Sequence, residues 1–349
     1  RGPVTADLVA ACGPMLVGGA AGTGKTELLR SLAASLAAGE RPDRLSLVLV
    51  DGDGDGLRIC GDLPHASTYL AAGDPVRMRE FAQALSGELK RRAELLGDRP
   101  YEAAWEAREA HEAYAGREPR REAAAGPVAR VVAQRRAGDG ADTAPSAAPP
   151  AGPAGPRPDV DRGTLKLRAR AQAPAPAAPG PLPRLVILVD DFDILVDPAL
   201  GNPGRPAAGS VVRALEAVAR DGARLGMHLV VATGRPERTA HTAADQGAAL
   251  RVSLGSDDPD GGPLPGRGTL HRPDGSSTAF QAGRVTGRIP RTATLRPTVV
   301  PLDWARAGDP PTRRPVRELG NGPTDLALLA SAIERAAREA GAPAAPPLL

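Results

Sequence analysis

The stretch Gly19-Ala20-Ala21-Gly22-Thr23-Gly24-Lys25-Thr26 decides the fold of this chain. It fits the pattern G-x-x-x-x-G-K-[ST], in which backbone N–H groups at the N-terminus of a helix hold a phosphate chain. A short apolar run at 13–17 precedes it and a helical pattern at 27–38 follows it, as this mechanism requires. We therefore predict a strand, a phosphate-binding loop and a helix, in preference to an ordinary glycine-rich turn before a helix.

The expected ligands of this loop are ATP and Mg²⁺. Lys25 would reach the β- and γ-phosphates, and the Thr26 hydroxyl would hold Mg²⁺. Lysine is rare in this arginine-rich chain, so a lysine at this position is a candidate for a retained role. The positive end of the helix dipole favours an anion at the backbone amides of the loop. The amides expected to surround the β-phosphate are those of Gly19, Ala20, Ala21, Gly22, Thr23 and Gly24.

A pair of acids follows a second buried strand. The apolar run 185–189 ends at Asp190 and Asp191, and a strand-end acid is the partner that a phosphate loop needs. Asp190 is expected to bind Mg²⁺ together with Thr26, directly or through water. Asp191 stands where motor ATPases usually carry a Glu that orients the attacking water. Its carboxylate lies about 1.5 Å further back, and such a misplacement can cost about a hundredfold in rate. We predict Lys25, Asp190 and Asp191 as catalytic groups, with Asp191 weakened; two strand-capping acids are the alternative.

The rest of the pattern predicts an α/β fold with a mainly parallel sheet. Apolar runs bounded by turn residues indicate further strands at 45–50 and 228–233, with His228 as a packed core residue. A closing β-hairpin is predicted at 268–285, with Pro273-Asp274-Gly275 as its turn. Helical periodicity covers 74–114, 210–225 and 324–340, the last capped by Thr324.

Composition limits the classes of function. Only 2% of the 349 residues are aromatic, so a stacking platform for single-stranded nucleic acid cannot be proposed. The formal charge of +3 implies neither nucleic acid nor membrane by itself. Two cysteines without zinc spacing indicate neither a disulfide framework nor a metal site. Residues 116–183 are rich in Pro, Ala, Gly and Arg without an apolar period, which predicts a disordered insertion.

The loop Asp51-Gly52-Asp53-Gly54-Asp55-Gly56 is a competing candidate site. With Asp62 at position twelve it imitates an EF-hand calcium loop. A strand precedes it instead of a helix, and Asp replaces the bidentate Glu, so a solvated acidic loop is the preferred interpretation. A contact with a partner subunit and a supporting role beside the nucleotide stay open as alternatives.

Several stretches resemble the FtsK/SpoIIIE family of motor ATPases. Glu27 directly after Gly-Lys-Thr resembles the family's GKSE and joins the expected nucleotide-binding residues. The run 185–192 (LVILVDDF) resembles a hydrophobic run that ends in DEF. The most family-specific piece is 226–236 (GMHLVVATGRP), which resembles G-x-H-L-x-x-A-T-Q-R-P. Pro265-Gly266-Arg267-Gly268 with Phe280-Gln281-Ala282 resembles the end of EssC-type modules of type VII secretion.

The resemblance covers roughly residues 3–96 and 184–285 and implies a RecA-like P-loop core. We predict that this core comprises residues 1–115 and 184–290, interrupted by the disordered insertion 116–183 and followed by a C-terminal extension with a terminal helix at 291–349. It implies a motor that uses ATP to move DNA or secreted protein, in a ring of identical chains or of tandem ATPase modules. It also implies a cytoplasmic domain. No apolar run in the chain is long enough to span a membrane, so tethering to the cell membrane would come from regions outside it.

Two departures from the family pattern concern hydrolysis. Gly234 replaces the usual Gln, which removes a γ-phosphate sensor, and Asp191 replaces the usual Glu. The residues expected to bind ATP are present, whereas two residues expected to support its hydrolysis are replaced, so two hypotheses follow. The chain is an ATPase with weakened catalytic groups, or it is a degenerate nucleotide-binding module that scaffolds or regulates assembly with little turnover. An arginine finger acting in trans is expected in a ring motor, and the candidates are Arg220, Arg224 and Arg235.

Overall fold

The computed structural model describes most of the residues of this chain. They are 2–115, 182–197, 209–255, 257–258, 262–292, 304–306, 308 and 318–348. The described residues belong almost entirely to one compact unit, made of residues 1–108 and 181–349. A second unit, 109–180, contributes only the last residues of one helix to the described part. The predicted disordered insertion 116–183 lies, but for its last two residues, outside the described residues, and the predicted division into four segments stays a prediction.

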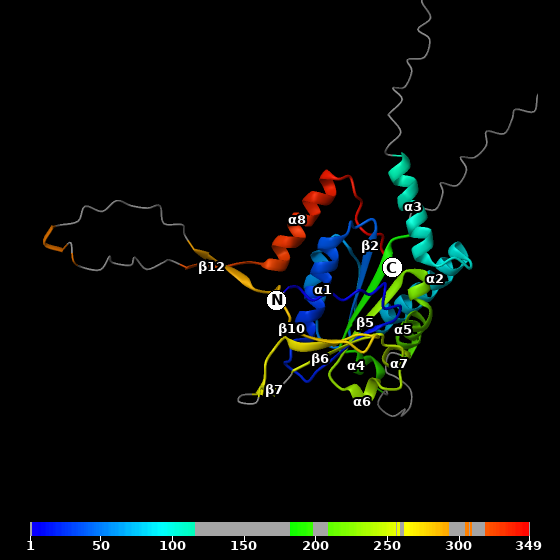
Figure 1. The fold of residues 1–349 in the computed structure, drawn as a ribbon, viewed down its shortest axis with the longest axis horizontal. Helices are drawn as coiled ribbons and strands as arrows, with labels where there is room; N and C mark the ends of the chain where they lie inside the picture. Colours follow the sequence, from blue (N-terminus) through cyan, green and yellow to red (C-terminus); the bar gives the residue numbers. More distant parts are fainter. Residues whose placement is uncertain are drawn as a thin grey trace, which may run out of the picture. The chain divides into compact units, whose positions relative to one another are not determined.

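An eight-stranded sheet forms the centre of the fold (Figure 1). Its strand order is β10-β9-β6-β1-β5-β4-β2-β3, in which the six strands from β6 to β3 run parallel and the last hairpin is antiparallel. The predicted mainly parallel α/β fold is thereby confirmed. The strands are β1 (Met15–Gly18), β2 (Leu45–Asp51), β3 (Ala66–Ala71), β4 (Arg184–Asp190), β5 (Met227–Thr233), β6 (Leu250–Leu254), β9 (Arg267–His271) and β10 (Ser277–Gln281).

Helices cover both faces of the sheet, which explains why its central strands are mostly apolar on both sides. Along β2, Leu47 and Leu49 pack on one face while Val48 and Val50 pack on the other, since successive side chains of a strand alternate. The first face carries α1 (Lys25–Gly39), α8 (Asp325–Glu339) and the 3₁₀ turn η1 (Arg58–Asp62). The other face carries α2 (Pro75–Leu96), α4 (Phe192–Val196) and α5 (Gly209–Asp221).

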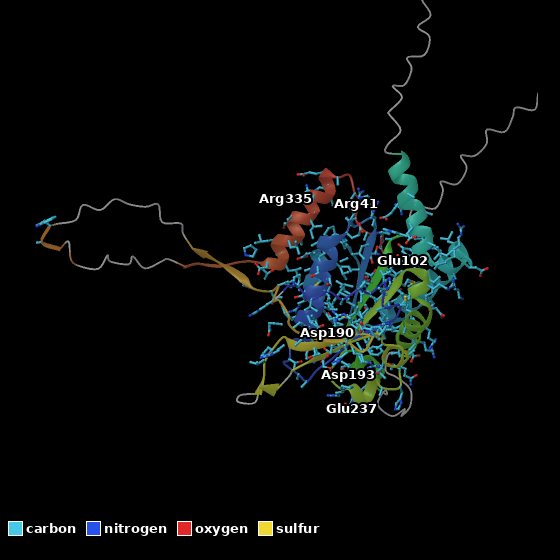
Figure 2. The ribbon with its side chains drawn as sticks, viewed as in Figure 1. Arg41, Glu102, Asp190, Asp193, Glu237 and Arg335 are labelled. Carbon is cyan, nitrogen blue, oxygen red and sulfur yellow. The ribbon has the colours of Figure 1, made fainter. Side chains whose placement is uncertain are left out.

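The topology brings the candidate site residues to one edge of the sheet. Because β1, β5, β4 and β2 are parallel neighbours, their carboxyl ends lie along the same edge. β5 lies between β1, which leads into the phosphate loop, and β4, which ends at Asp190. The end of β5 at Thr233 and Gly234 therefore falls between the loop and the acid pair. Asp190 and Asp193 lie toward one end of the sheet, away from Glu102 (Figure 2).

The predicted helix at 74–114 is wrong as a single element. It consists of two helices, α2 and α3 (Tyr101–Ala115). Asp74 caps the first by accepting hydrogen bonds from the amides of Val76 and Arg77. Gly97 ends it with a φ of +56°, and Pro100 then precedes the second helix, as helix-breaking residues do.

The predicted C-terminal elements are confirmed. β9 and β10 pair antiparallel with Gly268 opposite Phe280, as the expected hairpin requires. α8 begins after Thr324, whose hydroxyl accepts from the Ala327 amide. Strands β3 and β6 were not predicted. The helix predicted at 210–225 ends at Asp221 as α5, and the last predicted residues form the 3₁₀ turn η2 (Ala223–Leu225). The smaller unpredicted elements are η1, α4, α6 (Pro236–Thr239), α7 (Ala243–Gln246), β7 (Asp257–Asp258), β8 (Gly262–Pro263), β11 (Arg288–Thr292), η3 (Trp304–Arg306) and β12 (Glu318–Thr324). Among the described residues, no helix has the length and apolar character needed to cross a bilayer.

Candidate nucleotide site

The phosphate loop has the backbone geometry that its glycines allow. Gly22 and Gly24 have φ values of +79° and +97°, in a region that side chains disfavour. The Thr23 hydroxyl donates to the Ala20 carbonyl at 2.8 Å, which closes the loop on itself. α1 begins at Lys25 directly after this turn, so the free amides of its first turn face the loop.

The hairpin strand β9 braces the loop from outside. The Gly266 amide donates to the Thr23 carbonyl at 2.8 Å. A Cβ on Gly24 would lie 3.0 Å from the Gly266 nitrogen, so both positions require a small residue. The Gln281 side chain donates to the Pro265 carbonyl at 3.0 Å and fixes the bracing turn. The family resemblance singled out this Pro-Gly pair without a role, and the contact gives it one.

Lys25 is held by the loop itself. Its ammonium donates to the carbonyls of Gly19 and Ala20, at 2.9 and 3.0 Å. The side chain is 9% exposed, and carbonyl oxygens satisfy a cation there without neutralising it. A phosphate anion would offer this ammonium a stronger partner than neutral carbonyls do, because opposite charges also attract each other directly.

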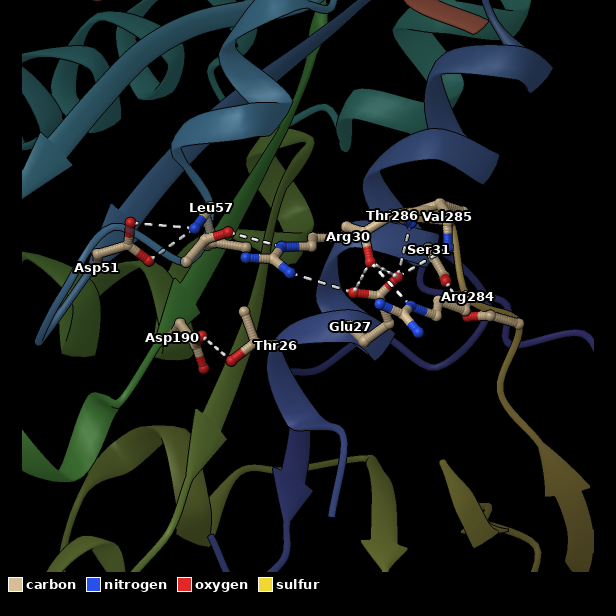
Figure 3. A network of polar contacts seen from close by, with 12 residues as sticks. Thr26, Glu27, Arg30, Ser31, Asp51, Leu57, Asp190, Arg284, Val285 and Thr286 are labelled. Carbon is tan, nitrogen blue, oxygen red and sulfur yellow. Dashed lines mark hydrogen bonds and ion pairs between the residues drawn. The ribbon is translucent and has the colours of Figure 1, made fainter. Parts of the chain in front are cut away.

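Thr26 and Asp190 join the start of α1 to the end of β4. The Thr26 hydroxyl donates to Asp190 Oδ2 at 2.5 Å (Figure 3). Asp190 is only 2% exposed, and its other oxygen accepts from the Asp191 amide at 3.1 Å. A hydroxyl and a carboxylate in contact are the hard oxygen ligands that Mg²⁺ prefers, so the residues present fit this ion.

Asp191 occupies a strained position beside this pair. Its φ of +46° and ψ of +47° lie in the left-handed region, which non-glycine residues adopt at a cost and mostly at functional sites. Burial raises the pKa of Asp191 to about 6, and the nearby charges of Asp190 and Asp193 add to the effect. The structure therefore brings the predicted catalytic residues together at the ends of β1 and β4.

Asp193 is a residue of this site that the sequence reasoning missed. Its buried carboxylate accepts from the Gly234 amide at 2.9 Å and from the Thr233 hydroxyl at 3.4 Å. Its second oxygen lies 4.0 Å from Arg235 Nε. A Cβ on Gly234 would lie 3.7 Å from Lys25 Nζ, which is ordinary van der Waals contact, so residue 234 lies directly beside the lysine. The available signal was an acid within the otherwise apolar stretch 192–196.

Glu27 engages the C-terminal part of the chain instead of the loop. Its carboxylate accepts from the Val285 amide at 2.7 Å and from the amide and hydroxyl of Thr286 at 2.9 and 3.0 Å. Arg30 pairs with it at 3.1 Å. Burial acts to raise the pKa of Glu27, but the hydrogen bonds from Thr286, Arg30 and Val285 outweigh it and the pKa is lowered. Figure 3 shows the Glu27 side chain directed toward Thr286, away from Asp190.

The acidic loop after β2 does not have the geometry of a calcium site. Asp51 is 1% exposed and accepts from the Leu57 amide and, at 2.8 Å, from the Tyr69 hydroxyl. Asp53 and Asp55 face solvent, as the solvated-loop interpretation predicts. Within the described part of the chain, no group of three or more His, Cys, Asp or Glu residues could hold a metal. The calcium alternative is therefore not supported.

The three candidate arginine fingers occupy different surroundings. Arg220 and Arg224 are exposed, and Arg224 donates to the Gly97 carbonyl at 3.0 Å. Arg235 lies 3.9 Å from Asp197 and borders Asp193, at the end of β5 that faces the site. Of the three, Arg235 is the one that the fold brings to the candidate site, and its role stays a prediction.

A strand, a glycine loop that leads into a helix, and a strand-end acid bonded to the loop's threonine define a P-loop nucleotide-binding domain. The parallel sheet with β5 between the loop strand and the acid strand gives it the RecA-like arrangement. Residues 1–238 match the FtsK/SpoIIIE family, and the chain belongs to that family. The resemblance stated from the sequence is thereby confirmed.

Relatives of known role come from mycobacterial secretion systems. The chain is 34% identical over 90 residues to the ESX-1 secretion system protein EccCb1 of Mycolicibacterium smegmatis, which covers 26% of this chain and 15% of that protein. It is 42% identical over 83 residues to the ESX-4 secretion system protein EccC4 of Mycobacterium tuberculosis, which covers 22% of this chain and 7% of that protein. The chain thus matches only a small part of these longer relatives.

Solved structures of type VII secretion ATPases share the fold. The cytoplasmic domain of Thermomonospora curvata EccC aligns with a TM-score of 0.52 and 20% identity, over 92% of this chain and 28% of that one. ATPases 2 and 3 of the same protein, in complex with a signal sequence peptide, align with a TM-score of 0.54 and 16% identity. That alignment covers 99% of this chain and 45% of the solved chain. At this level of identity the likeness concerns the fold alone.

Proposed function

We propose that this chain binds ATP with Mg²⁺ and hydrolyses it slowly, as one motor module of a type VII secretion ATPase. The observation that carries the proposal is the hydrogen bond of 2.5 Å between Thr26 and Asp190. It lies beside the glycine loop, whose carbonyl oxygens accept hydrogen bonds from Lys25. The two oxygens that would hold Mg²⁺ are already in contact across two elements that are distant in sequence. Little reorganisation is needed before the ion and the triphosphate bind.

The roles of the other residues follow from their positions. Amides of the loop 19–24 would hold the β-phosphate, and Lys25 would exchange its two carbonyl partners for phosphate oxygens. Bound Mg²⁺ supplies charge neutralisation on the phosphates. Asp191 would orient the water whose oxygen attacks the γ-phosphorus as the bond to ADP breaks. Its side chain is one methylene shorter than the usual Glu, which supports slow turnover.

The relatives support a secretion role in preference to DNA transport. EccCb1 and EccC4 are named as secretion system proteins, and a signal sequence peptide is bound to the solved ATPases 2 and 3 of EccC. We accordingly propose a secreted protein as the transported polymer, with DNA as the alternative. We also propose that the module works in the cytoplasm, in a ring or beside tandem modules, tethered to the membrane through other regions of a longer chain.

A second candidate function is nucleotide-dependent scaffolding without turnover. The absence of a polar side chain at Gly234 and the short side chain of Asp191 favour it, because both positions concern hydrolysis and not binding. In this case ATP occupancy would fix the packing of neighbouring modules. Binding and hydrolysis must therefore be measured separately.

Steady-state hydrolysis and equilibrium binding of ATP separate these proposals. For the ATPase we expect a slow rate that Lys25→Ala and Asp190→Asn each lower by about a hundredfold. The exposed Glu237→Ala serves as a control that leaves the rate unchanged. Tight ATP binding with no rate above that of Lys25→Ala would favour the scaffold. A wild-type chain that binds no ATP at millimolar concentration with Mg²⁺ would refute both.

A further inference from the structure

The loop between β2 and η1 is in direct contact with the acid pair of the candidate site. A Cβ on Gly52 would lie 2.2 Å from the Asp191 carbonyl oxygen, and the Gly52 amide donates to the Asp190 carbonyl at 3.0 Å. A Cβ on Gly56 would lie 2.7 Å from Thr26 Cγ2 and 3.1 Å from Asp190 Oδ2. Two glycines of this unusual Asp-Gly repeat are thus required by contact with residues 190 and 191.

Arg30 holds this loop in place from the other side. Its Nε donates to the Gly56 carbonyl at 2.7 Å, and its Nη1 pairs with Glu27 at 3.1 Å (Figure 3). Glu27 is itself fixed by the backbone of Val285 and Thr286. The guanidinium therefore bridges the first turns of α1 to the backbone that covers Thr26 and Asp190.

We propose that Arg30 and Gly56 are positioning residues for Mg²⁺: Arg30 clamps the Gly56 carbonyl, so that the backbone at Gly56 packs against Thr26 and Asp190 and fixes the direction of both oxygens. This inference rests on the proposed function, since it concerns the metal side of the same site. Neither residue touches the expected position of the phosphates, and both act through Thr26 and Asp190.

The chemistry of Mg²⁺ makes such positioning consequential. The ion requires near-ideal octahedral geometry at short distances, so its affinity is sensitive to small displacements of a ligand. A methyl group at residue 56 would lie 2.7 Å from Thr26 Cγ2, closer than real Cβ contacts, so Thr26 or the backbone at residue 56 must shift, and Asp190 Oδ2 at 3.1 Å must move slightly. Loss of the Arg30 guanidinium would leave the Gly56 carbonyl without this donor, so that the backbone at Gly56 could move away from Thr26 and Asp190. Binding of the nucleotide without metal depends on the loop 19–24 and Lys25, which these changes leave in place.

The test is the gain in ATP affinity that Mg²⁺ provides. Binding of a fluorescent ATP analogue to the 349-residue chain is measured with Mg²⁺ and with EDTA, for wild type, Gly56→Ala, Arg30→Met, Arg30→Lys and Gly61→Ala. A Cβ on Gly61 meets no atom within 4 Å, which makes it the matched control. Thermal unfolding of each variant establishes that it is folded.

We expect the Mg²⁺-dependent gain to fall about tenfold or more in Gly56→Ala and Arg30→Met, with affinity in EDTA within about twofold of wild type. Arg30→Lys, which can still donate to one carbonyl, should recover part of the gain, and Gly61→Ala should keep all of it. A full gain in folded Gly56→Ala and Arg30→Met would overturn the inference, as would equal losses with and without Mg²⁺. The wild-type chain alone tests the proposed function. That function fails if the wild-type chain binds no ATP analogue, or if Mg²⁺ does not increase its affinity for the analogue.

Discussion

Lys25, Gly234 and Asp193 meet at the end of β5, and single substitutions there address the chemistry directly. A Cβ on Gly234 would be in ordinary contact with Lys25 Nζ at 3.7 Å, so a longer side chain has room to start toward the phosphates. We predict that Gly234→Gln, which supplies the polar group usual in the family, raises single-turnover ATP hydrolysis by on the order of tenfold.

Gly234→Ala is the control for that substitution, because it changes the backbone freedom without adding a polar group. Its rate should stay within about twofold of wild type. Equal rates for the Gln and Ala variants would show that residue 234 has no part in sensing the γ-phosphate.

The Asp193 carboxylate leads to a prediction on stability. Removing it leaves the Gly234 amide and the Thr233 hydroxyl without their acceptor in a buried place. Asp193→Ala should lower the free energy of unfolding by about 2 kcal/mol, as expected for unsatisfied buried donors. Urea denaturation measures this, and the exposed Glu237→Ala should cost under about 0.5 kcal/mol. A loss no larger than that of the control would contradict the interpretation.

At the level of the element, β5 carries a buried histidine that makes stability depend on pH. His228 is packed under the N-terminal segment; the Leu8 backbone lies near the ring, but neither ring nitrogen has a hydrogen-bond partner of good geometry among the described residues. Burial lowers the pKa of His228 to about 4, and the charges of Arg184 and Arg92 act in the same direction, while Asp7 opposes them.

The sign of the pH effect follows from proton counting. Between pH 6.5 and about 4 the unfolded chain binds a proton at His228 that the folded chain does not, so stability falls as the pH falls. We predict a loss of about 3 kcal/mol over this window, most of which His228→Leu should remove. The buried His65, whose pKa burial also lowers, contributes equally to both proteins and cancels in the comparison. Parallel pH profiles of the two proteins would refute the prediction.

In helix α2, two neighbouring arginines, one buried and one exposed, form ion pairs with the same glutamate. Arg92 is 1% exposed, pairs with Glu88 at 2.7 Å and donates to the carbonyls of Pro183, Leu225 and Gly226. Arg91 pairs with the same Glu88 at 2.7 Å but is 49% exposed. We predict that Arg92→Ala costs about 4 kcal/mol in unfolding free energy, because it leaves three carbonyls without their buried donor and removes the interior partner of Glu88.

Arg91→Ala should cost under about 1 kcal/mol, because water screens and replaces an exposed ion pair. Chemical denaturation of both variants measures the difference. Equal costs would mean that the fold tolerates loss of the interior hydrogen bonds at Arg92 as easily as loss of a surface pair.

For the whole molecule, the sequence was sufficient to predict what depends on local pattern. The apolar runs of β2, β4 and β5 predict strands that are buried on both faces. The glycines of the phosphate loop indicate the backbone conformations that this loop adopts. The short edge strand β3, with its mixed Ala, Ser and Thr residues, has no such pattern and was missed. The role of Gly266 and the part played by Asp193 were missed for another reason: both depend on contacts, with Thr23 and Gly234 respectively, that only the folded topology creates.

Residue boundaries taken from family similarity differ from those of the folding unit. The FtsK/SpoIIIE match ends at residue 238, yet β6, β9 and β10 complete the sheet beyond it, and Leu326 and Ala330 of α8 are buried beside α1. We predict that a fragment 1–238 is unstable and aggregates, whereas the full chain 1–349 unfolds in one cooperative transition. Circular dichroism melting and size-exclusion chromatography distinguish them, and a fragment 1–238 with native melting behaviour would contradict this.

The Gly266 brace has a practical consequence for anyone dividing related proteins into modules. Thr23 depends on an amide more than two hundred positions downstream, so a cut chosen where sequence similarity fades removes a structural support of the phosphate loop. A recombinant fragment that ends before Gly266 would lose nucleotide affinity because its phosphate loop lacks this hydrogen bond. Such a loss in a truncated module would then be mistaken for the mark of an inactive ATPase.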